Sequence, residues 1–211
     1  MMNGILIRKQ SEPGKTGRGN FMKKIVIVIS VLALILASCS SRKGAVKEVK
    51  SGPAVINMVS GRDLVGEVNR AGFETKPFDA WFSKNYRDYR LDRKKLAELK
   101  SLWDDTEVLI IMGTWCPDSR REIPRLYKIL DNSGFDEKRL TVIAVDKAKY
   151  RKGEEPSGKY ANLNIKRVPT IIILKKGKEI GRIIESPVFS LEKDLSLILS
   201  GKSYKPNYLD L

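Results

Sequence analysis

The chain has 211 residues, a formal net charge of +15, two cysteines and no histidine. The absence of histidine excludes Ser-His-Asp triads, Cys-His nucleophile pairs and His-ligated metal sites. The two cysteines, at positions 39 and 116, are too far apart in sequence for a zinc knuckle or a disulfide framework. We therefore expect no metal and no cofactor. The length of the chain suits one domain with additional segments.

Residues 1–21 are polar and precede a second possible start at Met22. We predict that translation begins at Met22, which makes 1–21 a non-native upstream extension. Detection of any peptide from this segment by mass spectrometry would contradict that prediction.

Residues 22–38 have the pattern of a secretory signal peptide. A basic start, Met22-Lys23-Lys24, precedes a nearly apolar run from Ile25 to Ala37 that is short for a membrane-spanning helix. The run ends in Leu36-Ala37-Ser38-Cys39, which resembles the bacterial lipobox, where the cysteine is lipidated. We predict a lipoprotein of the bacterial cell envelope, anchored through Cys39 on the periplasmic or outer face. The alternative is a short membrane anchor with an incidental cysteine.

Most of the positive charge lies after residue 38. Residues 1–38 carry an excess of five positive charges, which leaves +10 on the rest of the chain. The basic residues are interleaved with acids, which favours a solvated surface over a surface for an acidic partner or for anionic lipid headgroups. The predicted export argues against nucleic acid as a partner.

After a polar tether at 39–53, residues 54–104 are predicted to form a helical extension that packs on the following domain. A helix is expected from 54 to about 73, although Gly61 and Gly66 weaken the pattern. Pro77 opens a second helix, and Asp92 caps a third with an apolar leucine stripe. The second helix has an aromatic face: Phe78, Trp81, Phe82, Tyr86 and Tyr89. Core packing explains that face better than a peptide groove or an assembly surface.

Residues 105–203 predict an α/β domain, followed by a tail at 204–211. Buried strands are expected at Val108–Met112, Leu140–Val145 and Thr170–Leu174, with a hairpin partner at Glu179–Glu185. A helix should run from Pro117 to about 132, and a second, capped by Ser190, through Leu199. The segment 147–157 is predicted to be a polar loop. This βαβ–ββα order implies a mixed central sheet whose first two strands are parallel and last two antiparallel.

Four features in order resemble the thioredoxin superfamily. Trp115-Cys116 follows a buried strand and opens a helix, and Pro124 lies eight residues after the cysteine. Arg167-Val168-Pro169-Thr170 precedes an apolar strand, as the family's cis-proline segment does, and Lys175–Ile180 resembles its closing hairpin. The resemblance implies a thioredoxin-like three-layer fold.

The resemblance also implies a site. The catalytic residues would be Cys116, Ser119, Trp115 and Pro169, and Trp115, Pro117, Arg167, Val168 and Pro169 would bind an extended substrate. Independently, a cysteine at a helix N-terminus faces unpaired N–H groups and a dipole that favours the thiolate. The neighbouring Arg120 and Arg121 would add positive charge, against Asp118, and the amide or hydroxyl of Ser119 would reach the sulfur.

Two departures from the family pattern concern the chemistry. Ser119 replaces the resolving cysteine, and Ile110 replaces a buried aspartate that assists proton transfer. We therefore expect a monothiol thiol–disulfide oxidoreductase or isomerase, in which Cys116 forms mixed disulfides with a protein, peptide or small thiol substrate and an external thiol resolves them. The alternative is a non-catalytic binding module in which Cys116 packs as a small apolar residue.

Overall fold

The structure, a computed structural model, describes residues 58–60 and 62–210. The predicted upstream extension, signal peptide, lipidated Cys39 and tether lie outside these residues. Within the described part, none of the helices is both long and apolar enough to cross a bilayer.

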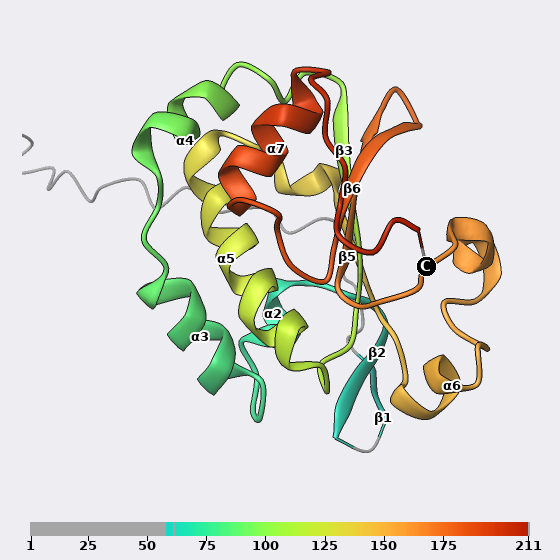
Figure 1. Ribbon diagram of the computed structural model, residues 1–211. Helices are drawn as coiled ribbons and strands as arrows, with labels where there is room; N and C mark the ends of the chain where they lie inside the picture. Colours follow the sequence, from blue (N-terminus) through green and yellow to red (C-terminus); the bar gives the residue numbers. More distant parts are fainter. Residues whose placement is uncertain (1–57, 61, 211) are drawn as a thin grey trace, which may run out of the picture. The chain divides into compact units, whose positions relative to one another are not determined.

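A mixed sheet of six strands forms the middle layer (Figure 1). In the order in which they pair, the strands are β1 (Met58–Ser60), β2 (Asp63–Val68), β4 (Leu140–Ala144), β3 (Thr106–Met112), β5 (Thr170–Lys175) and β6 (Lys178–Ile184). The β3–β4 pair is parallel and the other neighbours are antiparallel, which confirms the predicted βαβ–ββα arrangement.

Helices cover both faces of the sheet. They are α2 (Arg70–Phe73), α3 (Asp79–Asp88), α4 (Arg93–Leu99), α5 (Pro117–Ser133), α6 (Lys147–Arg151) and α7 (Leu191–Leu199), with 3₁₀ turns η1 (Glu137–Arg139) and η2 (Gly158–Leu163). Figure 1 shows α3, α4, α5 and α7 on one side of the sheet and α6 with η2 on the other. This is the predicted three-layer α/β fold.

The aromatic face of α3 lies in the core, as predicted. Phe78 and Phe82 are buried. The Phe82 ring stacks on Phe73 with centroids 5.4 Å apart and meets the edge of Tyr127 on α5 at 5.5 Å. Aromatic pairs of this kind add stability beyond their buried area, so α3 is fixed against the helix that carries the cysteine.

The helix expected over 54–73 is wrong for Met58–Ser60 and Asp63–Val68, which form the antiparallel strands of the β1–β2 hairpin, and right for Arg70–Phe73. Gly66 has φ +79°, a left-handed conformation that interrupts any helix. Gly66 also pairs with Ala144 of β4, so the hairpin belongs to the central sheet. The extension is therefore helical only from α2 onward.

The predicted polar loop at 147–157 begins instead with α6. The side chain of Asp146 accepts hydrogen bonds from the backbone N–H groups of Ala148 and Lys149, which is a helix N-cap. Asp146 was the local sequence signal for this helix.

Candidate functional site

Cys116 lies where β3 ends and α5 begins, as the N-cap residue of the helix, with Pro117 in the first helical position. Its backbone N–H donates to the carbonyl of Gly113 at 2.9 Å, which closes the turn between strand and helix. The residue is 7 % exposed, and its Sγ donates a hydrogen bond to the Val168 carbonyl at 3.1 Å. Cys116 is thus held between a helix N-terminus and the segment that precedes β5.

That segment has the geometry that the resemblance implies. The Val168–Pro169 peptide bond is cis. The Pro169 carbonyl accepts the N–H of Glu185 at 2.7 Å, and the Arg167 carbonyl accepts the hydroxyl of Thr170 at 2.6 Å. The Arg167 carbonyl, predicted to pair with substrate, therefore already has a partner within the chain.

Trp115 packs against the buried cluster that contains Cys116. Its indole Nε1 donates to the Val145 carbonyl at 3.0 Å, and its ring lies 5.7 Å from that of Tyr150. A Cβ added at Gly113 would lie 2.5 Å from the indole, so this position leaves room for the tryptophan only because it has no side chain.

Ser119 and Ile110 are both fully buried. The Ser119 Oγ accepts a hydrogen bond from the Gly113 N–H at 3.3 Å, which ties the first turn of α5 to the end of β3. Ile110 lies in the middle of β3, between β4 and β5. The position of the family's buried acid is thus occupied by core packing.

The basic residues after Cys116 are engaged by their own neighbours. Arg121 forms ion pairs with Asp118 at 2.6 Å and with Glu122 at 2.5 Å. The guanidinium of Arg120 donates to the carbonyl of Thr114. Arg121 therefore brings less positive charge to the sulfur than its position in the sequence predicts.

The β1–β2 hairpin supports the loop before the cysteine. The Thr114 hydroxyl oxygen accepts the N–H of Leu64 at 3.1 Å and donates its proton to the carboxylate of Asp63 at 3.0 Å. Thr114 is fully buried and directly precedes Trp115. Sequence reasoning missed this connection because it expected a helix at 63 and 64.

A family model described as thioredoxin matches residues 75–193, which is more than half of the chain. The chain belongs to the thioredoxin family. No curated protein matches it.

Several solved structures resemble this thioredoxin family member at low identity. A protein of unknown function from Pseudomonas aeruginosa has a TM-score of 0.45 at 16 % identity, over 65 % of this chain and 84 % of its own. The oxidised form of mitochondrial thioredoxin 3 from Saccharomyces cerevisiae has a TM-score of 0.27 at 20 % identity, over 47 % and 86 %. A mutant thioredoxin from Halobacterium salinarum has a TM-score of 0.31 at 16 % identity, over 56 % and 92 %.

The C-terminal tail lies beyond the thioredoxin match and contacts the site from the side of Arg167. The Arg167 guanidinium pairs with Glu185 at 2.9 Å and lies 4.2 Å from the centre of the Tyr208 ring. Hydrogen bonding to Glu185 raises the pKa of both Arg167 and Tyr208. Burial, followed by the electrostatic interaction with Cys116, raises the pKa of Tyr150.

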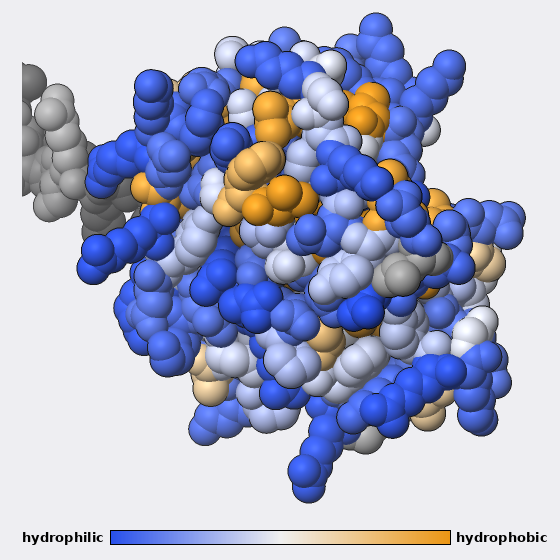
Figure 2. Space-filling model, in the orientation of Figure 1, coloured by the Kyte–Doolittle hydropathy of each residue, from blue (hydrophilic) through white to orange (hydrophobic). Residues whose placement is uncertain are grey.

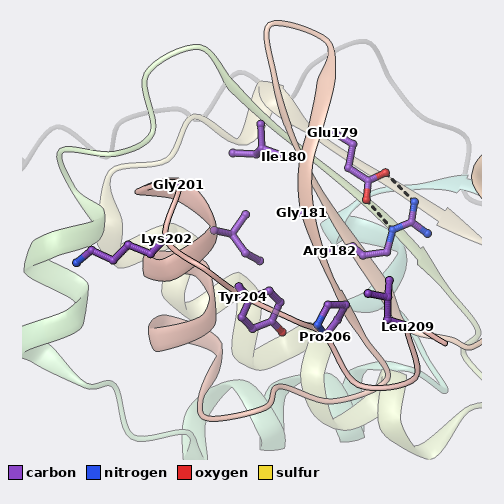
Figure 3. Close-up of a pocket in the computed structure, with 10 residues that line it drawn as sticks. Glu179, Ile180, Gly181, Arg182, Gly201, Lys202, Tyr204, Pro206 and Leu209 are labelled. Atoms are coloured by element: carbon purple, nitrogen blue, oxygen red, sulfur yellow. Dashed lines mark hydrogen bonds and ion pairs between the residues drawn. The ribbon is translucent and has the colours of Figure 1, made fainter.

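The tail is held in place along β6. The Tyr204 hydroxyl donates to Asp194 at 3.0 Å, and Asn207 donates to the Ser186 carbonyl at 3.0 Å. Figure 3 shows Tyr204, Pro206 and Leu209 lining a pocket of about 300 Å³ opposite β6. Its lining contains none of residues 115–119 or 167–169, so this pocket is separate from the cysteine. The sequence predicted these residues only as a tail.

Proposed function

We propose that the protein is a membrane-anchored thiol–disulfide oxidoreductase that works through the single thiol of Cys116. The observation that carries the proposal is the position of Cys116, at the N-terminus of α5 and against the Val168–Pro169 segment. The only other cysteine of the chain, Cys39, is the predicted lipid attachment site. No second thiol is therefore assigned to resolving a mixed disulfide.

The first step is attack on a substrate disulfide. Cys116 loses its proton, and its thiolate attacks one sulfur of the substrate, so that a Cys116–substrate S–S bond forms as the substrate's own S–S bond breaks. The leaving sulfur departs as a thiolate and takes up a proton from water. An external thiolate then attacks the substrate sulfur of the mixed disulfide and releases the Cys116 thiolate. The sulfur of the external thiol is thereby oxidised into a disulfide with the substrate, and the substrate sulfur that left in the first step is the one reduced to a thiol.

The residues around the sulfur suit this exchange. In the resting site the Val168 carbonyl accepts the Cys116 S–H. When the sulfur turns toward a substrate, that carbonyl becomes free to accept a backbone N–H from an extended substrate segment. Trp115 and Pro117 would supply apolar contact beside it, and Pro169 would orient the segment. Because the Arg167 carbonyl already accepts the Thr170 hydroxyl, substrate pairing would rest mainly on Val168.

Anchoring through Cys39 is part of the same proposal and rests on the lipobox resemblance. Replacement of Cys39 with Ser should move the protein from the membrane fraction to the soluble fraction of the cell envelope. Retention of the Cys39→Ser protein in the membrane, with its precursor cleaved, would contradict the lipid anchor.

A second candidate function is a thioredoxin-fold binding module without catalysis. It is favoured by the low exposure of Cys116, 7 %, and by the packing of the sulfur in a buried cluster that includes Ile111, Val145 and Ile172. Free cysteine at such positions behaves as a small apolar residue. If the protein is a binding module, the Cys116→Ala variant should still bind the same partners. If the protein is an oxidoreductase, the variant should lose thiol–disulfide exchange because the sulfur is gone.

The experiment that separates these functions is trapping and release. The purified full chain is incubated with a peptide disulfide, and intact mass spectrometry follows the peptide adduct on Cys116 and its removal by glutathione. The proposal expects an adduct that glutathione removes and that is missing in Cys116→Ala. Absence of the adduct in the wild-type protein would leave the binding module as the better account.

A further inference from the structure

The segment between β4 and β5 carries a cluster of basic side chains that the proposed exchange does not use. We call it the α6–η2 basic surface, and its residues are Lys147, Lys149, Arg151, Lys152, Lys159 and Lys166. All six are exposed. Among the residues that the structure describes, none of the six takes part in an ion pair.

Acidic residues do not balance this surface locally. Between 147 and 166 the only acids are Glu154 and Glu155, so the segment has a net charge of +4. The carboxylate of Glu155 already accepts the N–H of Asp146 at 2.6 Å. By contrast, the neighbouring Arg167 and Arg182 are neutralised by Glu185 and Glu179. A concentrated excess of one charge repels itself and attracts the opposite charge.

The basic surface lies beside the cysteine. Tyr150, Tyr160, Leu163 and Ile165 of the same segment pack against the buried cluster that contains Cys116. The ammonium of Lys147 lies 5.9 Å from the centre of the Trp115 ring. Lys166 is two positions before Val168, whose carbonyl binds the Cys116 sulfur. Figure 1 shows α6 and η2 on the opposite side of the sheet from α5, and α6 begins shortly after β4 ends.

We propose that the α6–η2 basic surface selects substrates whose reactive cysteine is flanked by acidic residues. The inference rests on the proposed function and adds the chemical class of its substrate. Lys147 of this surface lies beside the ring of Trp115, which directly precedes Cys116, so a peptide bound at the sulfur would come near these charges. Five of the six residues are lysines, which attract carboxylates as point charges without requiring one fixed geometry.

The other faces of the molecule do not offer the same match. Figure 2 shows hydrophilic residues over most of the visible face, with smaller apolar patches between them. On the helical side, charged residues occur in pairs such as Lys84–Asp88 and Lys95–Glu98. Within the described part of the chain, exposed lysines without an ion pair also occur on other elements, as at Lys94, Lys100 and Lys178. The residues of the α6–η2 basic surface differ because their segment packs against the buried cluster that contains Cys116, so a peptide substrate fits this surface better than a distant membrane or nucleic acid does.

The test compares two peptides of equal length, each with its one cysteine activated as a thiopyridyl disulfide. One peptide has glutamates on both sides of the cysteine and the other has lysines. Attack by Cys116 on the peptide sulfur forms the mixed disulfide and releases thiopyridone, whose absorbance gives the second-order rate constant. The full chain is used in neutral detergent at low and at high salt.

Wild-type protein should react roughly ten-fold faster with the acidic peptide than with the basic one at low salt, and the ratio should fall toward one as salt screens the charges. The triple variant Lys149→Glu, Lys152→Glu and Lys159→Glu should abolish or invert the ratio. The matched control Lys94→Glu, Lys100→Glu and Lys178→Glu changes the net charge equally on exposed positions of other elements. Its ratio should stay within about two-fold of wild type, since these lysines lie on α4, at its C-cap and on β6 rather than in the 147–166 segment.

Three outcomes would overturn the inference. The first is a wild-type ratio near one while the neutral reagent 2,2′-dithiodipyridine still modifies Cys116, which leaves the proposed function standing. The second is an equal loss of the ratio in the control triple, which assigns the effect to net charge. The third concerns the triple variant at Lys149, Lys152 and Lys159. If this variant no longer binds anionic phosphatidylglycerol vesicles but keeps the wild-type peptide ratio, the surface binds the membrane rather than the substrate. If the neutral reagent fails to modify Cys116, the proposed function itself fails, and the inference with it.

Discussion

The link between the β1–β2 hairpin and the cysteine loop is open to a quantitative test through Thr114→Val. Valine has nearly the shape of threonine, so the change removes the hydroxyl and leaves the packing in place. Two hydrogen bonds are lost, one from the Leu64 N–H at 3.1 Å and one to the Asp63 carboxylate at 3.0 Å. The position is fully buried, so water cannot replace the hydroxyl around Thr114 itself.

A neutral buried hydrogen bond contributes about 1 kcal/mol and one to a charged group about 1.5–3 kcal/mol. Asp63 is half-buried, and water there recovers part of the loss. We therefore expect Thr114→Val to lower the free energy of unfolding by about 2–3 kcal/mol. For a domain of this size that corresponds to a fall in Tm of roughly 5–10 °C.

The assay is urea unfolding followed by tryptophan fluorescence, with Thr114→Ser as the matched control. Serine keeps the hydroxyl and loses one buried methyl group, so it should cost only about 1 kcal/mol. A loss below about 0.5 kcal/mol in Thr114→Val, or a serine variant less stable than the valine variant, would refute the role assigned to the hydroxyl.

Three further substitutions test the site and the tail. Ser119→Ala leaves the buried Gly113 N–H without its partner and should cost about 1–2 kcal/mol in urea unfolding; an unchanged midpoint would show that this hydrogen bond contributes nothing. Gly113→Ala places a Cβ 2.5 Å from the Trp115 indole, so the emission spectrum of the protein should shift as the ring moves, and an identical spectrum would contradict the contact. Asp194→Ala removes the acceptor of the Tyr204 hydroxyl and of two backbone N–H groups. We expect the free energy of unfolding to fall by about 2–4 kcal/mol and the tail to be cleaved faster by protease. Protection of the tail equal to wild type would show that other contacts hold it.

Much of the thioredoxin-like domain could be predicted because its signals are local. Runs of apolar residues mark β3, β4 and β5, and Asp92 and Ser190 act as the N-caps that the sequence predicted. The two-residue turn at Lys176 and Gly177 has the positive φ angles that join β5 to β6. Such features depend on neighbours within a few positions, so the sequence alone specifies them.

The hairpin could not be predicted because its stability comes from distant residues. β2 is a strand because Gly66 and Val68 pair with β4, more than seventy positions further along the chain. Strand formation depends on such partners more than on intrinsic preference. The same reason explains why the Thr114–Asp63 bond was missed.

The candidate site divides in the same way. Trp115, Cys116 and Pro169 were predicted as site residues from sequence motifs, and the structure brings Cys116 to the Val168–Pro169 segment. The contacts of Glu185 and Tyr208 with Arg167 were not predicted. They depend on how β6 and the C-terminal tail return to the cis-proline segment, and only the three-dimensional arrangement shows that.

The most direct test of the central claim is the reactivity of the Cys116 thiol in the folded protein relative to the unfolded protein. The rate with neutral 2,2′-dithiodipyridine is measured at one pH in buffer and in urea, with mass spectrometry assigning the product to Cys116. If Cys116 is a thiol for exchange, the folded protein should react at least as fast as the unfolded chain, because exchange requires the folded site to present the sulfur to an incoming disulfide. A folded rate roughly a hundred-fold or more below the unfolded rate, as expected when a buried thiol reacts only after local opening, would contradict the account and identify Cys116 as a core residue.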